Sequence, residues 1–280
     1  MSRTKRNDPE PQALDPLPAG TRAILRPGHE AVAYHIPIFP STDDGTPLKS
    51  TIALPRHSAW TSGLHFHATH TEYLRLVKGA VFVELNGKTK LISALAGGEL
   101  KATGQLVQPG LTIEVPRYAF HSWGRLEHYN DSARSRRRVQ KDFLPEDWSE
   151  EVVVEEWTNP SDIAKSLFFW NLNGILTVPG DTIQPKRQSI AKALLGSLWV
   201  DLKLFVVFWE LDNWPVFHVL RNVSPATDSY LRTLRVLDAA EIFVSFGILL
   251  IAKLLGVLLG LKAVDQRRTP DALWEVHIKS

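Results

Sequence analysis

Residues 64–79 read LHFHATHTEYLRLVKG, and this stretch decides the fold. His65 and His67 are two residues apart, so on a β-strand both imidazoles point to the same face. Glu72 follows after four residues, which is enough for a tight turn. Residues 73–77 have the composition of a second strand, and Lys78-Gly79 closes it as a turn. Two imidazoles and a carboxylate therefore converge.

A second stretch, residues 110–123, reads GLTIEVPRYAFHSW and adds His121 after a strand and a proline turn. A His-x-His pair alone is common on strands and often has no ligand role. The spaced Glu, Gly and Pro-x4-His that accompany it favour a metal site. Three neutral imidazoles and one carboxylate suit a divalent ion such as Fe, Mn, Zn, Ni or Cu. We expect His65, His67, Glu72 and His121 to be its ligands.

The two stretches resemble the paired motifs of the cupin superfamily. His65, His67, Glu72 and Gly79 match the first motif, and Gly110, Pro116 and His121 match the second. Three positions depart from the pattern: Ala59 and Tyr118 replace glycines, and Arg125 replaces an asparagine. The resemblance covers roughly residues 30–157 and implies a mainly β chain with a cupin (jelly-roll) β-barrel. The departures affect turns and put the loop shape in doubt, not the ligand set.

Cupins include enzymes of many reaction classes and proteins without catalytic activity. The chain also resembles single-barrel cupins encoded beside polyketide pathways in filamentous fungi, many of them described as oxidoreductases. This resemblance implies an Fe(II)-dependent, or similar, oxidoreductase of secondary metabolism. An isomerase or cyclase that uses the metal as a Lewis acid is the alternative. A metabolite-binding cupin and a membrane-anchored interaction protein are two further classes, but neither requires the full ligand set.

The composition is that of a globular chain of 280 residues with a net charge of +2. The absence of cysteine excludes disulfides and thiolate metal sites. No nucleotide-binding glycine fingerprint is present, so we expect no nucleotide cofactor. A basic cluster in residues 134–141 precedes acidic residues, which favours a solvated loop or a lid over a nucleic-acid site. We expect a small-molecule substrate and no nucleic-acid partner, and a homodimer is compatible with the sequence.

Residues 1–28 are rich in proline and charge, without an apolar leader, and are predicted to be a disordered tail. Residues 30–157 form the predicted barrel, with an Asn86-Gly87 hairpin turn between two strands. The expected strands are residues 31–38, 50–54, 60–67, 72–77, 80–85, 89–93, 111–115, 120–123 and 151–157.

Strand alternation places further side chains inside the barrel. Thr61, Leu74 and Trp123 are candidate substrate-binding residues, although Leu74 and Trp123 fit ordinary core packing equally well. The predicted pocket is mostly apolar, which suits an apolar or aromatic organic substrate. His70 is a candidate for holding Glu72 or a metal-bound water, and an exposed turn histidine is the simpler interpretation.

Residues 158–280 are predicted to be helical. Residues 242–261 are mostly apolar, carry a single charge at Lys253 and are long enough to span a bilayer. A buried helix of a soluble, cytoplasmic protein is the alternative. Whether residues 190–217 also cross is left open. Because no signal peptide precedes the barrel, we expect a membrane-associated protein whose cupin domain is cytosolic.

Overall fold

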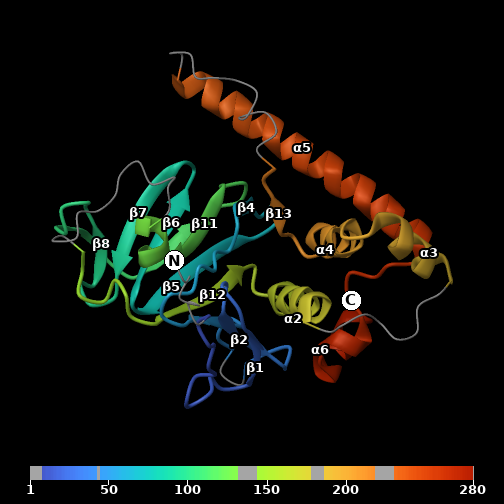
Figure 1. The fold of residues 1–280 in the computed structure, drawn as a ribbon, viewed down its shortest axis with the longest axis horizontal. Helices are drawn as coiled ribbons and strands as arrows, with labels where there is room; N and C mark the ends of the chain where they lie inside the picture. The colour runs from blue at the N-terminus through green and yellow to red at the C-terminus, as the bar shows by residue number, and fades with distance from the viewer. Residues whose placement is uncertain (1–7, 43–44, 132–143, 178–185, 218–229, 280) are drawn as a thin grey trace, which may run out of the picture.

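The computed structural model describes residues 8–42, 45–131, 144–177, 186–217 and 230–279. Two antiparallel sheets lie on one side of the molecule, and helices cover the other side, with the longest helix along the outer edge (Figure 1). The basic cluster at residues 134–141 falls outside the described residues. The expected mainly β barrel followed by helices is therefore confirmed.

The first sheet has the strand order β1-β2-β3-β12-β5-β10, and the second has the order β13-β4-β11-β6-β7-β8-β9. The first comprises β1 (Thr21–Arg26), β2 (Val32–Pro37), β3 (Ser50–Leu54), β5 (Thr71–Lys78), β10 (Thr112–Val115) and β12 (Val152–Asn159). The second comprises β4 (His65–Phe66), β6 (Ala80–Leu85), β7 (Lys88–Ser93), β8 (Gly98–Leu100), β9 (Leu106–Pro109), β11 (His121–Arg125) and β13 (Trp214–Pro215).

The main core lies between the two sheets. Their inward side chains are mostly β-branched or leucine, as alternation along half-buried strands requires. The buried cluster includes Ile52, Leu54, Leu74, Leu76, Val81, Val83, Trp123 and Val154.

The N-terminal segment differs from the expectation. The sequence predicts disorder for residues 1–28, yet Thr21–Arg26 forms β1 and pairs with β2. Further upstream, the backbone N–H of Leu14 donates to His35 Nε2 at 2.9 Å, and Leu14 packs on a small buried cluster. The proline-rich composition of the first residues concealed this edge strand, whose side chains are only partly buried.

The helical region consists of short helices and one long one. They are α2 (Ala164–Thr177), α3 (Lys186–Leu195), α4 (Leu198–Glu210), α5 (Tyr230–Leu259) and α6 (Asp271–His277), with a 3-10 turn at Gln266–Arg268. A further short helix, α1 (Leu126–Asp131), lies within the barrel region between β11 and β12. Trp170 anchors α2 on β2, because its indole N–H donates to the carbonyl of Pro37 at 2.9 Å.

The helices at residues 190–217 are too short to span a bilayer. The helices α3 and α4 have 10 and 13 residues, which makes them about 15 and 20 Å long. The hydrocarbon core of a membrane is about 30 Å thick. A break at Gly196, where φ is +57°, separates the two helices. We therefore discard a second membrane crossing in this stretch.

Two glycines between consecutive strands test the local geometry: Gly79 connects β5 to β6 across the two sheets, and Gly87 lies in the β6–β7 hairpin. Gly79 has a φ of +76°, and a Cβ atom there would lie 2.4 Å from the carbonyl oxygen of Glu151. Gly87 has a φ of +74° but nothing within 4 Å of the same position. It follows Asn86, whose φ is +49°, so the predicted Asn-Gly hairpin turn is present.

We predict that Gly79→Ala lowers the free energy of unfolding by at least about 2 kcal/mol, since it adds a backbone clash to the left-handed strain. Gly87→Ala is the matched control, because it adds only the strain, about 1 kcal/mol. Urea denaturation of both variants measures the difference. Equal losses of stability in the two variants would show that the close approach of Glu151 to Gly79 adds no cost beyond the backbone strain.

Candidate metal centre

Four side chains predicted to be metal ligands come together between the two sheets. His65 lies on β4, His67 follows that strand, and His121 lies on β11 opposite His65. Glu72 reaches the same point from β5 in the other sheet. Their candidate ligand atoms all lie within 4.8 Å of one another, and all four residues are buried. The structure therefore groups the complete predicted set.

Each histidine is oriented by its Nδ1 atom. This nitrogen lies 2.9 Å from the carbonyl of Gly63 for His65, 2.5 Å from that of Asp212 for His67, and 3.0 Å from that of Ala119 for His121. Because a carbonyl accepts, Nδ1 carries the proton and Nε2 keeps its lone pair. The Nε2 atoms of His67 and His121 are buried, without a hydrogen-bond partner among the described residues.

The two oxygens of Glu72 have different surroundings. Oε2 lies 2.7 Å from Nε2 of His121 and 3.6 Å from Nε2 of His67. Oε1 accepts a hydrogen bond from the ammonium group of Lys165. The lone pairs of two neutral imidazoles therefore face a carboxylate oxygen, and these electron-rich atoms repel one another. A cation placed between them would be coordinated by all of them and would remove the repulsion. The orphaned nitrogens and the donor set fit a divalent metal ion.

Burial and neighbouring charges set the protonation of the centre. Burial, with the adjacent His121 and His67, holds the pKa of His65 well below its usual range, so this imidazole is neutral. Burial alone would raise the pKa of Glu72, but Lys165 and His67 oppose it and leave that pKa well below its ordinary value. A neutral imidazole and an ionised carboxylate are the forms that bind metals.

The structure adds two residues that the sequence did not single out. The ammonium of Lys165, on α2, also lies 3.0 Å from Oε2 of Glu156, on β12. The indole N–H of Trp123 donates to Oε1 of Glu156 at 2.7 Å. Burial raises the pKa of Glu156. Burial by itself would lower the pKa of Lys165, but the charges of Glu156 and Glu72 outweigh it and raise that pKa above its ordinary value. The only sequence signal was a lysine within an apolar helix stripe.

Asp212 is a third addition, and it holds the loop between His67 and Glu72. Its carboxylate accepts the backbone N–H groups of Ala68 at 2.7 Å, Thr69 at 3.0 Å and His70 at 3.1 Å. Its backbone carbonyl accepts from His67. Burial alone would raise the pKa of Asp212, but hydrogen bonds from the side chains of His70 and Thr69, with those from the backbone, hold it well below its ordinary value. A sequence separation of 145 residues hides the pairing from sequence analysis.

His70 is buried, so its interpretation as an exposed turn histidine is wrong. One ring nitrogen lies 2.9 Å from Asp162 and the other lies 2.8 Å from Asp212. Hydrogen bonds to these two carboxylates raise the pKa of His70 to about 9. Both ring nitrogens of His70 therefore contact carboxylates other than Glu72. His70 reaches the centre only indirectly, through Asp212, whose carbonyl orients His67.

A cavity of about 170 Å³ opens beside the centre. His65, Lys165 and Glu156 line it together with Thr61, which was a predicted substrate contact. Leu74 and Trp123, the other two candidates, line a separate small void in the core between the sheets. The remaining walls are mostly aromatic or aliphatic: Tyr34, Ile52, Trp60, Phe168, Phe169, Leu172 and Phe208.

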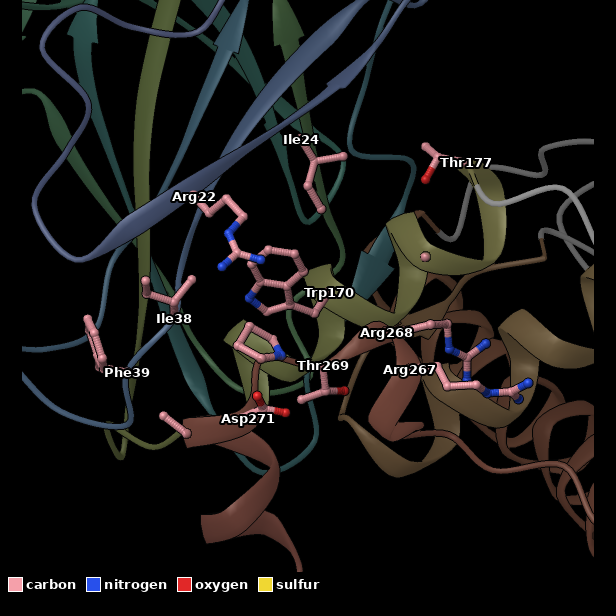
Figure 2. A pocket seen from close by; sticks show the side chains of 13 residues that line it. Arg22, Ile24, Ile38, Phe39, Trp170, Thr177, Arg267, Arg268, Thr269 and Asp271 are labelled. Atoms are coloured by element: carbon pink, nitrogen blue, oxygen red, sulfur yellow. The ribbon is translucent and has the colours of Figure 1, made fainter. Parts of the chain in front are cut away.

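A larger cavity, of about 560 Å³, lies away from the histidines. Figure 2 shows Arg22 beside Trp170 on one side of it and Arg267 with Arg268 on the other. The guanidinium of Arg22 lies 5.8 Å from the Trp170 ring centroid, and Arg267 pairs with Asp265 at 2.7 Å. Since it contains no predicted ligand, we place the candidate reaction site in the smaller cavity.

Several known structures have some similarity to this chain, and two of them are described as cupin-2 proteins. KdgF from Halomonas sp. is similar over 45% of this chain and 79% of that chain, at 16% identity and a TM-score of 0.26. A predicted oxalate decarboxylase from Thermotoga maritima is similar over 49% and 90%, at 14% identity and a TM-score of 0.28. A cupin-2 domain protein from Rhodospirillum rubrum is similar over 54% and 78%, at 13% identity and a TM-score of 0.31. No family model and no curated protein matches the sequence.

The resemblance to cupins is confirmed at the level of the fold. The two facing antiparallel sheets form the expected barrel, and both motifs deliver their histidines and glutamate to one buried point. The chain thus has a cupin-type barrel with a cluster of three histidines and one glutamate that could hold a metal ion.

We predict that Asp212→Ala weakens the binding of a divalent ion about tenfold to a hundredfold, because the loop that orients His67 loses its anchor. Isothermal titration with Co(II) measures the affinity. Asp201→Ala, at an exposed position on α4, is the control and should leave the affinity unchanged. An unaltered Co(II) affinity in the Asp212 variant would show that Asp212 is not needed to position the metal ligands.

Proposed function

We propose that this chain is a metal-dependent enzyme that acts on a small organic molecule, with His65, His67, Glu72 and His121 as metal ligands. The observation that carries the proposal is the set of Nδ1 anchors, which aims the imidazoles at Oε2 of Glu72. A binding module or a scaffold has no need of such a buried, fully oriented ligand set. The adjoining cavity supplies the space for a substrate.

The reaction that we propose first is an oxidoreduction of an apolar or aromatic substrate, within secondary metabolism such as polyketide biosynthesis. The aromatic walls of the cavity support an apolar or aromatic ligand. Fe(II) is the preferred ion, with Mn, Zn and Ni as alternatives, since three imidazoles and a carboxylate accept each of them. When bound, such an ion supplies Lewis-acid polarisation or, for Fe and Mn, a redox centre.

An isomerase or cyclase is the second candidate, and the Lys165–Glu156 pair supports it. Both groups line the cavity beside His65, and their contact of 3.0 Å places a proton donor next to a carboxylate. Burial raises the pKa of Glu156, which brings it closer to the range useful for proton transfer. This chemistry requires a Lewis acid but no change in metal oxidation state.

We predict that the purified protein contains a stoichiometric transition metal and that the double variant His65→Ala, His67→Ala loses it, because half of the ligand set is removed. Inductively coupled plasma analysis measures the content. The control variant His29→Ala, His57→Ala removes two exposed histidines and should keep the metal. Full metal content in the first variant would refute the centre.

Metal exchange separates the two reaction classes. Once a turnover assay is found by incubation with a panel of small aromatic compounds, Zn(II) should replace Fe(II) without loss of rate in an isomerase or cyclase. The same exchange should abolish an oxidoreduction, because Zn(II) has no accessible second oxidation state.

The outer face of α5 supports a membrane location. One stripe of this helix packs inward: Glu241, Ser245, Leu249, Ala252 and Gly256 are buried. Every exposed position from 236 to 258 is apolar or glycine: Val236, Ala239, Phe243, Gly247, Leu250, Ile251, Leu254, Leu255, Val257 and Leu258. Val236–Leu259 is long and apolar enough to cross a bilayer by length and composition. We propose that this face lies in lipid while the barrel stays in the cytosol.

Two features fit α5 to such a position while it stays attached to the protein. Lys253, the charge within the apolar stretch, pairs with Glu210 on α4 and so turns toward the protein. A Cβ atom at Gly256 would lie only 2.6 Å from the side chain of Val206 on α4. The glycine therefore lets α5 lie close against α4. An apolar face of this extent, left in water, is otherwise a site of aggregation.

We predict that the full-length protein floats with phosphatidylcholine–phosphatidylglycerol vesicles in a density gradient and that Phe243→Glu with Leu254→Glu reduces the floated fraction at least tenfold, since charge in the hydrocarbon is costly. Leu95→Glu, at an exposed leucine of the barrel, is the control. The membrane location would be wrong if the wild-type protein did not bind vesicles but formed a stable dimer, and if the variant were monomeric. The outer face of α5 would then be the contact with a second copy of this chain.

A further inference from the structure

The charges around the candidate metal centre do not balance once an ion is bound. The buried ionisable groups at the inner end of the 170 Å³ cavity are Glu72, Glu156 and Lys165. The three histidines are neutral in the orientation that their Nδ1 anchors impose. Two carboxylates and one ammonium sum to one negative charge, so a divalent ion leaves this end of the cavity with one net positive charge. A proton on Glu156 would make this excess larger. On the far side of His67, His70 pairs with Asp212 and with the partly exposed Asp162, and none of these three lines the cavity.

An uncompensated charge in a buried site is unfavourable, and the further anion on the wall, Glu30, is accompanied by the cation Arg26. Among the residues that line the cavity, Arg26 and Glu30 carry the remaining charges, and these are of opposite sign. The net charge at the inner end must therefore be met by what enters the cavity. Neutral polar groups on the wall, such as Thr61 and Asn213, cannot supply it.

We propose that the substrate is a small organic anion, a monocarboxylate or an enolate with an aromatic or branched apolar body, and that Lys165 is the residue that binds its charged oxygen beside the metal. This inference rests on the proposed metal centre. It names the charge of the substrate, which the apolar character of the pocket alone does not predict.

The position of Lys165 suits this role. Its ammonium contacts Glu72 and Glu156, so it is held next to the ligand set, and it also lies on the cavity wall beside His65. An ammonium has three N–H donors, and two carboxylate contacts leave one for the substrate. The ring of Phe169, 5.4 Å from the ammonium, stabilises the same charge from the wall.

The opposite wall provides a further polar contact and the apolar surface. The hydroxyl of Tyr34 accepts the indole N–H of Trp60 at 3.0 Å and a guanidinium N–H of Arg26 at 3.4 Å. Its own hydrogen can then be donated to an anionic oxygen in the cavity. Burial raises the pKa of Tyr34 to about 12, which keeps this hydrogen in place at neutral pH. Phe168, Trp60 and Phe208 face the remainder of a ligand.

The experiment uses full-length protein loaded with Co(II), whose visible absorption reports on its ligands, and benzoate as the probe. Benzamide is the neutral isostere of benzoate. We expect benzoate to change the Co(II) spectrum saturably and benzamide to bind at least about tenfold more weakly, as expected for loss of a charge-assisted hydrogen bond. Lys165→Met should weaken benzoate at least tenfold, whereas Lys165→Arg, which keeps the charge, should retain part of the affinity.

The outcomes separate this inference from the proposed function. Lys101→Met, at an exposed lysine, is the matched control and should bind benzoate like the wild type, and circular dichroism checks the fold of every variant. A protein that binds Co(II) but does not distinguish benzoate from benzamide overturns the anionic substrate and leaves the metal centre intact. Benzoate affinity unaffected by Lys165→Met overturns the role of Lys165. Failure to bind Co(II) at all overturns both proposals.

Discussion

The buried carboxylate of Glu72 is the constraint on which the rest of the structure depends. Its side chain is 2% exposed, and a carboxylate in such a place is stable only with compensating charge and hydrogen bonds. Lys165 from α2 supplies compensating charge directly, whereas His121 from β11 and His67 from the end of β4 face the carboxylate with lone pairs and would stabilise it only through a shared cation. The barrel alone supplies only the histidines. The helix α2, which follows the last long strand, is therefore part of the centre and not only a cover for the barrel exterior.

The loop between α4 and β13 extends this dependence on the helical region. Asp212 has a φ of +53°, an unusual backbone conformation for a residue other than glycine, and its carboxylate accepts hydrogen bonds from the loop after His67. The next residues form β13, which pairs Trp214 with Phe66 and Pro215 with His65. The segment that carries two candidate metal ligands, β4 with the following His67, is thus held on one side by β11 and on the other by a segment about 145 residues later in the chain.

Sequence analysis predicted the elements whose signals are local and missed those that depend on distant contacts. Strand alternation and the Asn86-Gly87 turn predicted most strands of the barrel but not β1, β8, β9 or β13, and the expected strand at residues 60–67 is limited to His65–Phe66. The motif spacing predicted that the four candidate ligands come together. Tyr118 replaces a motif glycine yet adopts the left-handed conformation, with a φ of +62°, and its N–H donates to the carbonyl of His67 at 2.7 Å. The turn is therefore kept. Lys165 and Asp212 could not be predicted, because nothing local to a helix or a turn shows which distant group it will contact.

The helix α5 has two faces whose roles are physically distinct. Its inner stripe supports the ligand strand, since the hydroxyl of Ser245 donates to the carbonyl of Pro215 at 2.7 Å and the ring of Phe246 lies 4.1 Å from that of Trp214. Its outer face is open in the described part of the chain, where Phe243 and Leu258 are 76% and 71% exposed. A change on the inner stripe should therefore reach the metal centre through β13 and β4. A change on the outer face should alter only what the protein attaches to, because α4 separates that face from the cavity, with Val206 toward α5 and Phe208 toward the cavity.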